Sequence, residues 1–265
     1  MNKRLTAKLK RLFTSYNRNL LIEMIYADFK MYDRDSILGT FWILLNPMIT
    51  LLIMYCVFET RFGHSIQFYP LYILIGIATV NFFINVTTKM INSISFNRYV
   101  VLNSTIPREN FILTDLFVHI YKLFIELSLC WLLSIYYGVF AWQAVLLALP
   151  LLAALAGLAL GAGMIISLIY CYAMDIEHIW RIITRLLLFV TPVFYSLEHI
   201  SHFFSKVIYW FNPLTPFLIA FRQIIIWNNS LDLVNYAYSI CWGCCFLVLG
   251  YLVFITFENT AIEQV

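Results

Sequence analysis

The stretch YDRDSILGTFWILLNP (residues 32–47) joins a charged segment to the start of a long apolar run and sets an Asn-Pro pair inside that run. The charges Asp33, Arg34 and Asp35 precede apolar sequence that continues to about residue 58. A helix needs about 20 apolar residues to cross the roughly 30 Å of hydrocarbon in a membrane. The stretch therefore predicts the entry into a first spanning helix, with a helix breaker inside the bilayer.

The composition extends this interpretation to the whole chain. Of the 265 residues, 62% are hydrophobic and 12% are charged, and the mean hydropathy is +0.83. Soluble domains average about 45–50% apolar and about 25% charged residues. We expect an all-α integral membrane protein with about six spanning helices and no large soluble domain. The first 20 residues lack the apolar core of a cleaved signal peptide, so we expect the first spanning segment to direct insertion.

Six apolar segments and the basic residues between them give the expected topology. Thirteen of the 17 Lys and Arg residues lie in the N-terminal arm and in the second and fourth connections, against three on the opposite side. Because basic residues collect on the cytoplasmic side, we expect both termini in the cytoplasm and the chain in the cytoplasmic (inner) membrane. We divide the chain into a cytoplasmic helix (1–35) and a six-helix transmembrane domain (36–265). The expected segments are 39–58, 69–87, 116–137, 144–170, 182–197 and 234–257.

The basic N-terminal arm is expected to form an amphipathic helix on the membrane surface. Its apolar residues recur at spacings of three and four, as in Leu5, Leu9 and Leu12. Such helices lie on anionic lipid headgroups. We therefore expect no nucleic-acid partner, and a merely solvated basic tail is the alternative.

The fifth segment is irregular because Pro192 interrupts it. Two short apolar pieces follow, at 203–211 and 217–227, and pieces of about ten residues are too short to span a membrane. Non-helical backbone at membrane depth is tolerated only where protein or a water-filled cavity covers it. We expect re-entrant outer-face helices at about 198–230, and the alternative is an interfacial pair with no passage beneath it.

The third segment holds one cluster of ionisable groups, formed by Asp115, His119, Lys122 and Glu126. Their spacing of four, three and four residues puts them on one helical stripe about 60° wide. A charge that faces lipid costs at least about 2.5–3.5 kcal/mol, so the stripe must face protein or water. Its function would be a proton relay, and the alternative is a polar seam against a neighbouring helix.

Aromatic and small residues give two further predictions. Aromatic residues make up 18% of the chain and many suit the interfacial belts of a membrane protein. Gly157 and Gly161 form a small-xxx-small face, which favours close contact with another helix of the same chain over dimerisation. Aromatic faces along a passage suit sugar rings, and the candidates for such a lining are Tyr55, Phe58, Phe189, Phe194 and Tyr195.

The sequence contains no energy source of its own. None of the nine glycines precedes a lysine, so the phosphate-binding loop of ATPases is absent. All six cysteines fall in apolar stretches without the spacing of a zinc site, so we expect buried thiols and no metal.

The segment KMYDRDSILGTFWILLNP (30–47) resembles the N-terminal signature of permease subunits of polysaccharide-exporting ABC transporters, which include O-antigen, teichoic-acid and capsule exporters. The segments YPLYILIGI, STIPREN and NPLTPFLIAFR resemble later elements of that family. Two departures are Met31, where the family has Arg or Lys, and Met174, where it often has Arg before the retained Asp175. The matching signature residues are Lys30, Tyr32, Ser36, Leu38, Gly39, Trp42 and Pro47.

The resemblance implies a homodimer that moves a lipid-linked glycan outward, driven by two cytoplasmic ATPase subunits. ATP and Mg²⁺ would be bound by those subunits, and this chain would be neither an enzyme nor a cofactor-binding subunit. Two alternatives are a membrane-embedded glycosyl or acyl transferase, which would need the Asp115 and His119 pair, and a proton-coupled transporter. The residues best placed to couple to the ATPase are Pro107, Arg108, Glu109, Asp175, Glu177 and His178.

The Asn-Pro pair of the first segment takes its expected role from this resemblance. Ser36, Gly39, Trp42 and Asn46 share one helical face, and Pro47 predicts a kink because it removes a backbone hydrogen bond. We expect this face to line the cytoplasmic half of the passage, with Trp42 and Asn46 contacting the substrate. The alternative is an interfacial anchor at Trp42 and a helix-to-helix bond at Asn46.

Overall fold

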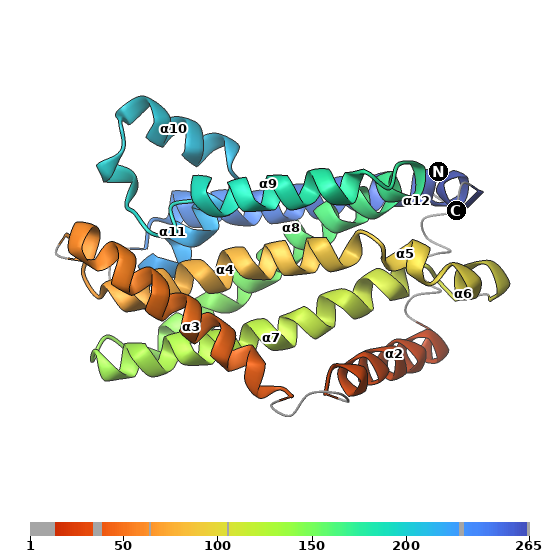
Figure 1. Ribbon diagram of the computed structural model, residues 1–265, viewed down its shortest axis with the longest axis horizontal. Coiled ribbons are helices and arrows are strands. Elements are labelled where there is room, and N and C mark those ends of the chain that lie inside the picture. Colours follow the sequence, from red (N-terminus) through yellow and green to blue (C-terminus); the bar gives the residue numbers. More distant parts are fainter. Residues whose placement is uncertain (1–13, 34–38, 64, 105, 228–230, 264–265) are drawn as a thin grey trace.

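The computed structural model describes residues 14–33, 39–63, 65–104, 106–227 and 231–263, and these residues are folded into helices joined by short turns (Figure 1). The signature residues Ser36 and Leu38 lie outside the described residues, and so does the part of the predicted N-terminal helix before residue 14. The helices are α2 (Ser15–Asp33), α3 (Phe41–Phe58), η1 (Glu59–Gly63), α4 (Tyr69–Met90), α5 (Ser93–Phe96), α6 (Arg98–Asn103), α7 (Glu109–Tyr136), α8 (Trp142–Tyr172), α9 (Ile176–Val190), η2 (Leu197–His199), α10 (His202–Phe211), α11 (Leu214–Ile225) and α12 (Leu233–Glu263).

Among the described residues, five helices are long and apolar enough to cross a membrane: α3, α4, α7, α8 and α12. The multi-pass membrane fold predicted from composition is therefore confirmed. α9 has 15 residues, fewer than the about 20 that a straight span needs.

Two predicted segments begin six or more residues earlier in the structure than predicted, at 109 instead of 116 and at 176 instead of 182. The third begins at Glu109 rather than 116, because its first polar side chains are buried against other helices instead of lying in a loop. The fifth runs over Ile176–Val190 rather than 182–197. Thr191 ends it in an extended conformation, as the residue before a proline prefers.

Figure 1 shows α4 at the centre of the bundle, between α3 and α9. It packs against α3, α7, α8, α9 and α11, and most of its side chains are buried. A helix that is apolar on all sides is covered either by other helices or by membrane lipid, and the burial of α4 shows that other helices cover it. α4 is therefore the core of the protein. We call the two ends of the bundle the α6 end, which carries α5 and α6, and the α10 end.

The packing of α8 against α12 depends on glycines from both helices. A Cβ atom on Gly161 would meet the backbone carbonyl of Phe246, and one on Gly250 would meet the backbone of Gly161. A Cβ atom on Gly157 would lie 3.2 Å from the carbonyl oxygen of Gly243. The predicted intrachain contact of Gly157 and Gly161 is confirmed, and it makes α8 and α12 a closely packed pair.

We predict that Gly161→Val destabilises the protein, because the new side chain must displace the α12 backbone. Overpacking of this kind costs about 1–3 kcal/mol. The measurement is the thermal unfolding midpoint of detergent-purified protein. Ala237→Val, on the exposed side of α12, is the matched control and should leave the midpoint unchanged. Equal midpoints for the two variants would contradict this account of the α8–α12 contact.

Candidate functional site

The most heavily bonded polar centre among the described residues is Arg222, on α11 at the α10 end. Its side chain is buried, with the residue 2% exposed. Nη1 donates to the carbonyl oxygen of Pro192 at 2.8 Å, and Nη2 donates to that of Val193 at 2.8 Å. Nε and Nη2 both donate to the carbonyl oxygen of Tyr72, at 3.3 and 3.2 Å. One guanidinium thus joins α11, α4 and the segment that follows α9.

Arg222 donates hydrogen bonds to backbone carbonyl groups that have no helical partner because α9 ends at Val190. Thr191, Pro192, Val193 and Phe194 are buried but not helical. Buried carbonyl groups need hydrogen-bond partners, and the planar fork of arginine can serve several at once. The guanidinium also lies over the ring of Tyr72, with Cζ 3.3 Å from the ring centroid, which is cation–π geometry.

Two tyrosines of α4 and one asparagine complete the support of this segment. The hydroxyl of Tyr69 donates to the carbonyl oxygen of Phe194, and that of Tyr72 donates to the carbonyl oxygen of Tyr195, both at 2.9 Å. Asn212 Nδ2 donates to Thr191 Oγ1 at 2.8 Å. The segment 191–195 is therefore fixed against α4 and α11 by side chains from both.

Gly76 of α4 leaves the room that this arrangement needs. A Cβ atom there would lie 2.9 Å from Val193 Cγ1 and 3.1 Å from Arg222 Nη2. The close approach of α4 to the segment 191–195 therefore requires glycine at this position.

The predicted passage residues fall into two groups. Tyr55, Phe58, Phe194 and Tyr195 gather near the segment 191–195: the rings of Phe58 and Phe194 stack at 5.3 Å, and the hydroxyl of Tyr195 donates to the carbonyl oxygen of Val190 at 2.9 Å. Tyr55 donates to Glu59 Oε1 at 2.9 Å. Phe194 is 3% exposed, so its ring packs inside the bundle.

Trp42, Asn46 and Phe189 are exposed on the bundle surface and are not part of that cluster. Of the residues in α3, Ile43 and Pro47 are buried, so α3 lies at the edge of the bundle with most of its surface uncovered. α3 continues through Pro47, and the carbonyl of Asn46 accepts a hydrogen bond from Thr50 Oγ1 at 2.8 Å. Gly39, just before α3, has a φ of 43°, a conformation that favours glycine.

The polar stripe of α7 is buried at Asp115 and His119 and partly covered at Lys122 and Glu126. Asp115 and His119 are buried, and His119 Nδ1 hydrogen bonds to the carbonyl oxygen of Asp115 at 2.7 Å. Lys122 and Glu126 are half-buried. α7 packs against α2 and α4 here, and the charges of Asp28 and Lys89 from those helices act on the stripe. This arrangement supports the polar seam over the proton relay.

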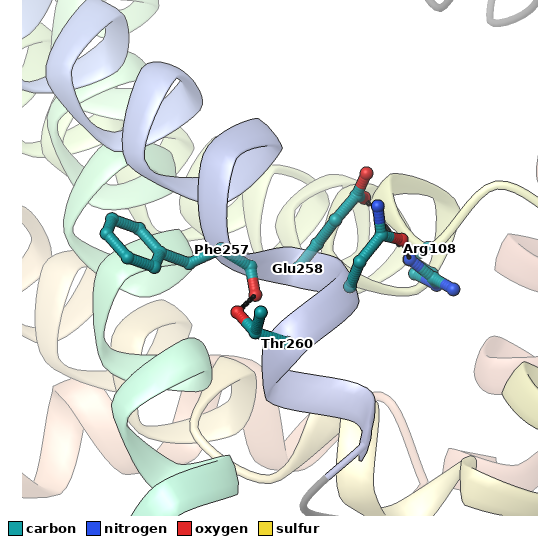
Figure 2. A network of polar contacts seen from close by, with 5 residues as sticks. Arg108, Phe257, Glu258 and Thr260 are labelled. Atoms are coloured by element: carbon teal, nitrogen blue, oxygen red, sulfur yellow. Dashed lines mark hydrogen bonds and ion pairs between the residues drawn. The ribbon is translucent and has the colours of Figure 1, made fainter.

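The predicted coupling residues lie at the α6 end in two different environments. Pro107 and Glu109 are buried, and Arg108 Nη1 donates to Asn259 Oδ1 of α12 at 2.7 Å (Figure 2). Burial lowers the pKa of Arg108, and the nearby Glu109 opposes that shift. Asp175 and His178 are exposed, and Glu177 pairs with Arg181 at 2.6 Å.

Sequence reasoning missed two features. The α5–α6 tip projects from the bundle (Figure 1). Two of its aromatic side chains are uncovered: Phe96 is 85% exposed and Tyr99 is 80% exposed. Arg222 was counted only as a basic residue of the outer side. Its position as the one cation in FLIAFRQII was a usable signal, because a charge inside an apolar piece must find partners. The described residues contain no group of three or more His, Cys, Asp or Glu side chains that could hold a metal ion.

Comparison with known proteins gives matches over most of the chain. The sequence model of the ABC-2 type transporter family matches residues 19–226. The O-antigen export system permease protein RfbA of Klebsiella pneumoniae is 24% identical over 243 residues, which cover 90% of this chain and 92% of that protein. The protein of the same name from Myxococcus xanthus is 24% identical over 217 residues, which cover 81% of this chain and 83% of that protein.

We predict that Arg222→Met loosens the segment 191–195, because it leaves several buried carbonyl groups without donors. Each such group costs about 1–3 kcal/mol. Hydrogen exchange followed by mass spectrometry should show faster exchange in this segment and in the neighbouring turns of α4. Arg222→Lys should rescue only in part, since an ammonium cannot reproduce the planar fork. Unchanged exchange in both variants would mean that the cation does not hold the segment.

Proposed function

This chain belongs to the ABC-2 type transporter family, and we propose that it is the membrane-spanning permease subunit of an exporter that moves a lipid-linked polysaccharide outward across the cytoplasmic membrane. The observation that carries the proposal is the match to O-antigen export permeases, which covers 90% of this chain and 92% of the Klebsiella protein. A match of that extent leaves no large part of either protein unaccounted for. It favours a polysaccharide of the O-antigen type.

The arrangement of charges supports an orientation with the α6 end in the cytoplasm. Lys89, Arg98, Arg108 and Arg181 belong to helices and turns of that end. Basic residues near the ends of spanning helices remain in the cytoplasm. Both termini then lie on the cytoplasmic side, and the polysaccharide leaves at the α10 end.

We infer that α9 is a sixth spanning element, completed by the segment 191–195. α9 alone is short, but the buried extended residues after it lengthen its path along α4. α11, with 12 residues that are mostly buried, is too short to span and fits a re-entrant helix. No residue of α10 is buried, so α10 fits the outer membrane surface.

A homodimer provides the passage in this proposal. α3 and α9 flank α4 on one side of the bundle, and each leaves most of its surface uncovered: α9 buries only Thr184 (Figure 1). A polar chain cannot cross hydrocarbon without a lined path, because each unsatisfied polar group costs several kcal/mol. Two copies that face each other through α3 and α9 enclose such a path. Its walls carry Trp42, Asn46, Tyr55, Phe58, Phe189 and Tyr195.

The cytoplasmic ATPase subunits dock on the α6 end. Phe96 and Tyr99 present apolar side chains far from the bundle, as an interface core requires. Asp175, Glu177 and His178 lie at the adjacent corner between α8 and α9 and add polar contacts. ATP and Mg²⁺ are bound by the ATPase subunits. The relatives do not favour the transferase or the proton-coupled transporter.

The passage is tested by cysteine labelling in inverted membrane vesicles that contain the ATPase. In a variant without the six native cysteines, Trp42→Cys, Asn46→Cys and Ile49→Cys should react with a membrane-impermeant thiol reagent. A stalled glycan should block the reaction. Ile43→Cys, buried on the same helix, is the control and should stay unlabelled. Absence of labelling at all three positions in folded protein would remove α3 from the passage.

Transport itself is tested in proteoliposomes that contain the permease, its ATPase and a lipid-linked O-antigen. We expect ATP-dependent movement of the glycan to the opposite leaflet, read by its sensitivity to a glycosidase. Tyr99→Glu should abolish both movement and co-purification of the ATPase, because it places a charge in the docking surface. Tyr99→Phe is the conservative control and should retain both. ATP-independent movement would contradict the proposal, and co-purification of the ATPase with Tyr99→Glu would contradict the docking assignment.

A further inference from the structure

Three consecutive residues near the end of α12 are bonded to two other parts of the chain, and Figure 2 shows the contacts with one of them, Arg108. Arg108 Nη1 donates to Asn259 Oδ1 at 2.7 Å and lies 3.8 Å from Glu258 Oε2. The hydroxyl of Tyr172 donates to Thr260 Oγ1 at 3.0 Å, and the same Thr260 hydroxyl donates to the carbonyl oxygen of Phe257 at 2.9 Å. Residues 258–260 thus hold both the start of α7 and the end of α8. We call them the α12 joint.

Burial makes the Arg108 contact more than a surface ion pair. The side chain of Glu258 is 3% exposed and that of Arg108 is 25% exposed. Water screens an exposed ion pair, whereas a buried carboxylate is more sensitive to a change of the charge beside it. The hydrogen bond to Asn259 is charge-assisted and fixes the direction of the guanidinium.

The two residues bonded to the α12 joint, Arg108 and Tyr172, lie next to the two connections at the α6 end, which we call corners: the one between α6 and α7 and the one between α8 and α9. Arg108 precedes the first residue of α7 and follows the α5–α6 tip by a few residues. Tyr172 is the last residue of α8, directly before the turn that leads to α9. Both corners carry proposed ATPase contacts, and both end on the same turn of α12. Because glycine contacts pack α12 closely against α8, a force on either corner reaches this helix pair.

We propose that the α12 joint transmits ATPase-driven movement of both corners to the α8–α12 pair, and that Arg108 is a positioning residue within it and not a contact of the ATPase. This inference rests on the proposed function. In this proposal Arg108 contacts α12 of its own chain and not the ATPase subunit. Figure 2 shows its side chain beside α12, where Nη1 donates to Asn259 Oδ1.

A charge swap distinguishes the two roles of Arg108. Arg108→Glu and Glu258→Arg should each lower the ratio of glycan moved to ATP hydrolysed by about tenfold, because each places like charges together. The double variant Arg108→Glu/Glu258→Arg should restore the ratio to within about threefold of wild type. If the single variants uncouple transport and the swap does not restore it, Arg108 acts on the ATPase and the inference is wrong. Wild-type ratios in the single variants overturn it as well.

A second pair of variants keeps the test independent of folding. Tyr172→Phe removes one hydroxyl from the joint and should lower the same ratio by about threefold, with ATP hydrolysis retained. Tyr236→Phe is the matched control, because its hydroxyl links α12 to the carbonyl oxygen of Leu147 in α8 at 2.9 Å near the α10 end. An equal loss in both variants would mean that the joint only stabilises the helix pair. If the wild-type complex moves no glycan, the proposed function fails and this inference falls with it.

Discussion

The structure depends on one constraint: backbone polar groups inside a hydrocarbon layer must find partners within the protein. An unbroken helix meets this requirement by itself, but the chain breaks α9 at Thr191 and Pro192 and leaves buried carbonyl groups without helical donors. Arg222 supplies the missing donors from α11. The fold can therefore place irregular backbone beside the proposed passage, where a regular helix would present only side chains.

That solution ties together elements that are far apart in the sequence. Arg222 bonds to the carbonyl of Tyr72 in α4, 150 residues earlier. Gly76, one turn further along α4, leaves the space that Val193 and the guanidinium occupy. α4 is thus both the core of the bundle and the support for the broken segment, and α3 and α9 remain at its edge with most of their surfaces uncovered.

The sequence predicted the features that depend on composition and on the spacing of residues along a helix. It missed the features that depend on contacts between residues far apart in the chain. Five of the six predicted spanning helices, the short apolar pieces and the intrachain contact of Gly161 follow from apolar length and residue size. The start of α7 was misplaced because polar side chains such as Glu109 were assigned to a loop, although other helices bury them. The end of α9 was misplaced because Thr191, before Pro192, is extended and stops the helix. The sequence around Arg108 and Arg222 does not identify their partners, which include Asn259 and Tyr72, about 150 residues away in the chain.

The burial of α4 on all sides also has a consequence for biogenesis. α4 is the second of the long helices to leave the ribosome, yet α7, α8, α9 and α11, which enclose it, are all made after it. Until then its apolar surface must be covered by lipid, which solvates Ile and Leu side chains as well as protein does. The space beside Gly76 is filled by Val193 and then by Arg222 of α11, both of which are made after α4. We therefore expect α4 to enter the bilayer early and to be surrounded by lipid at first. The helices that enclose it pack around it later, and Arg222 is among the last of its contacts to form.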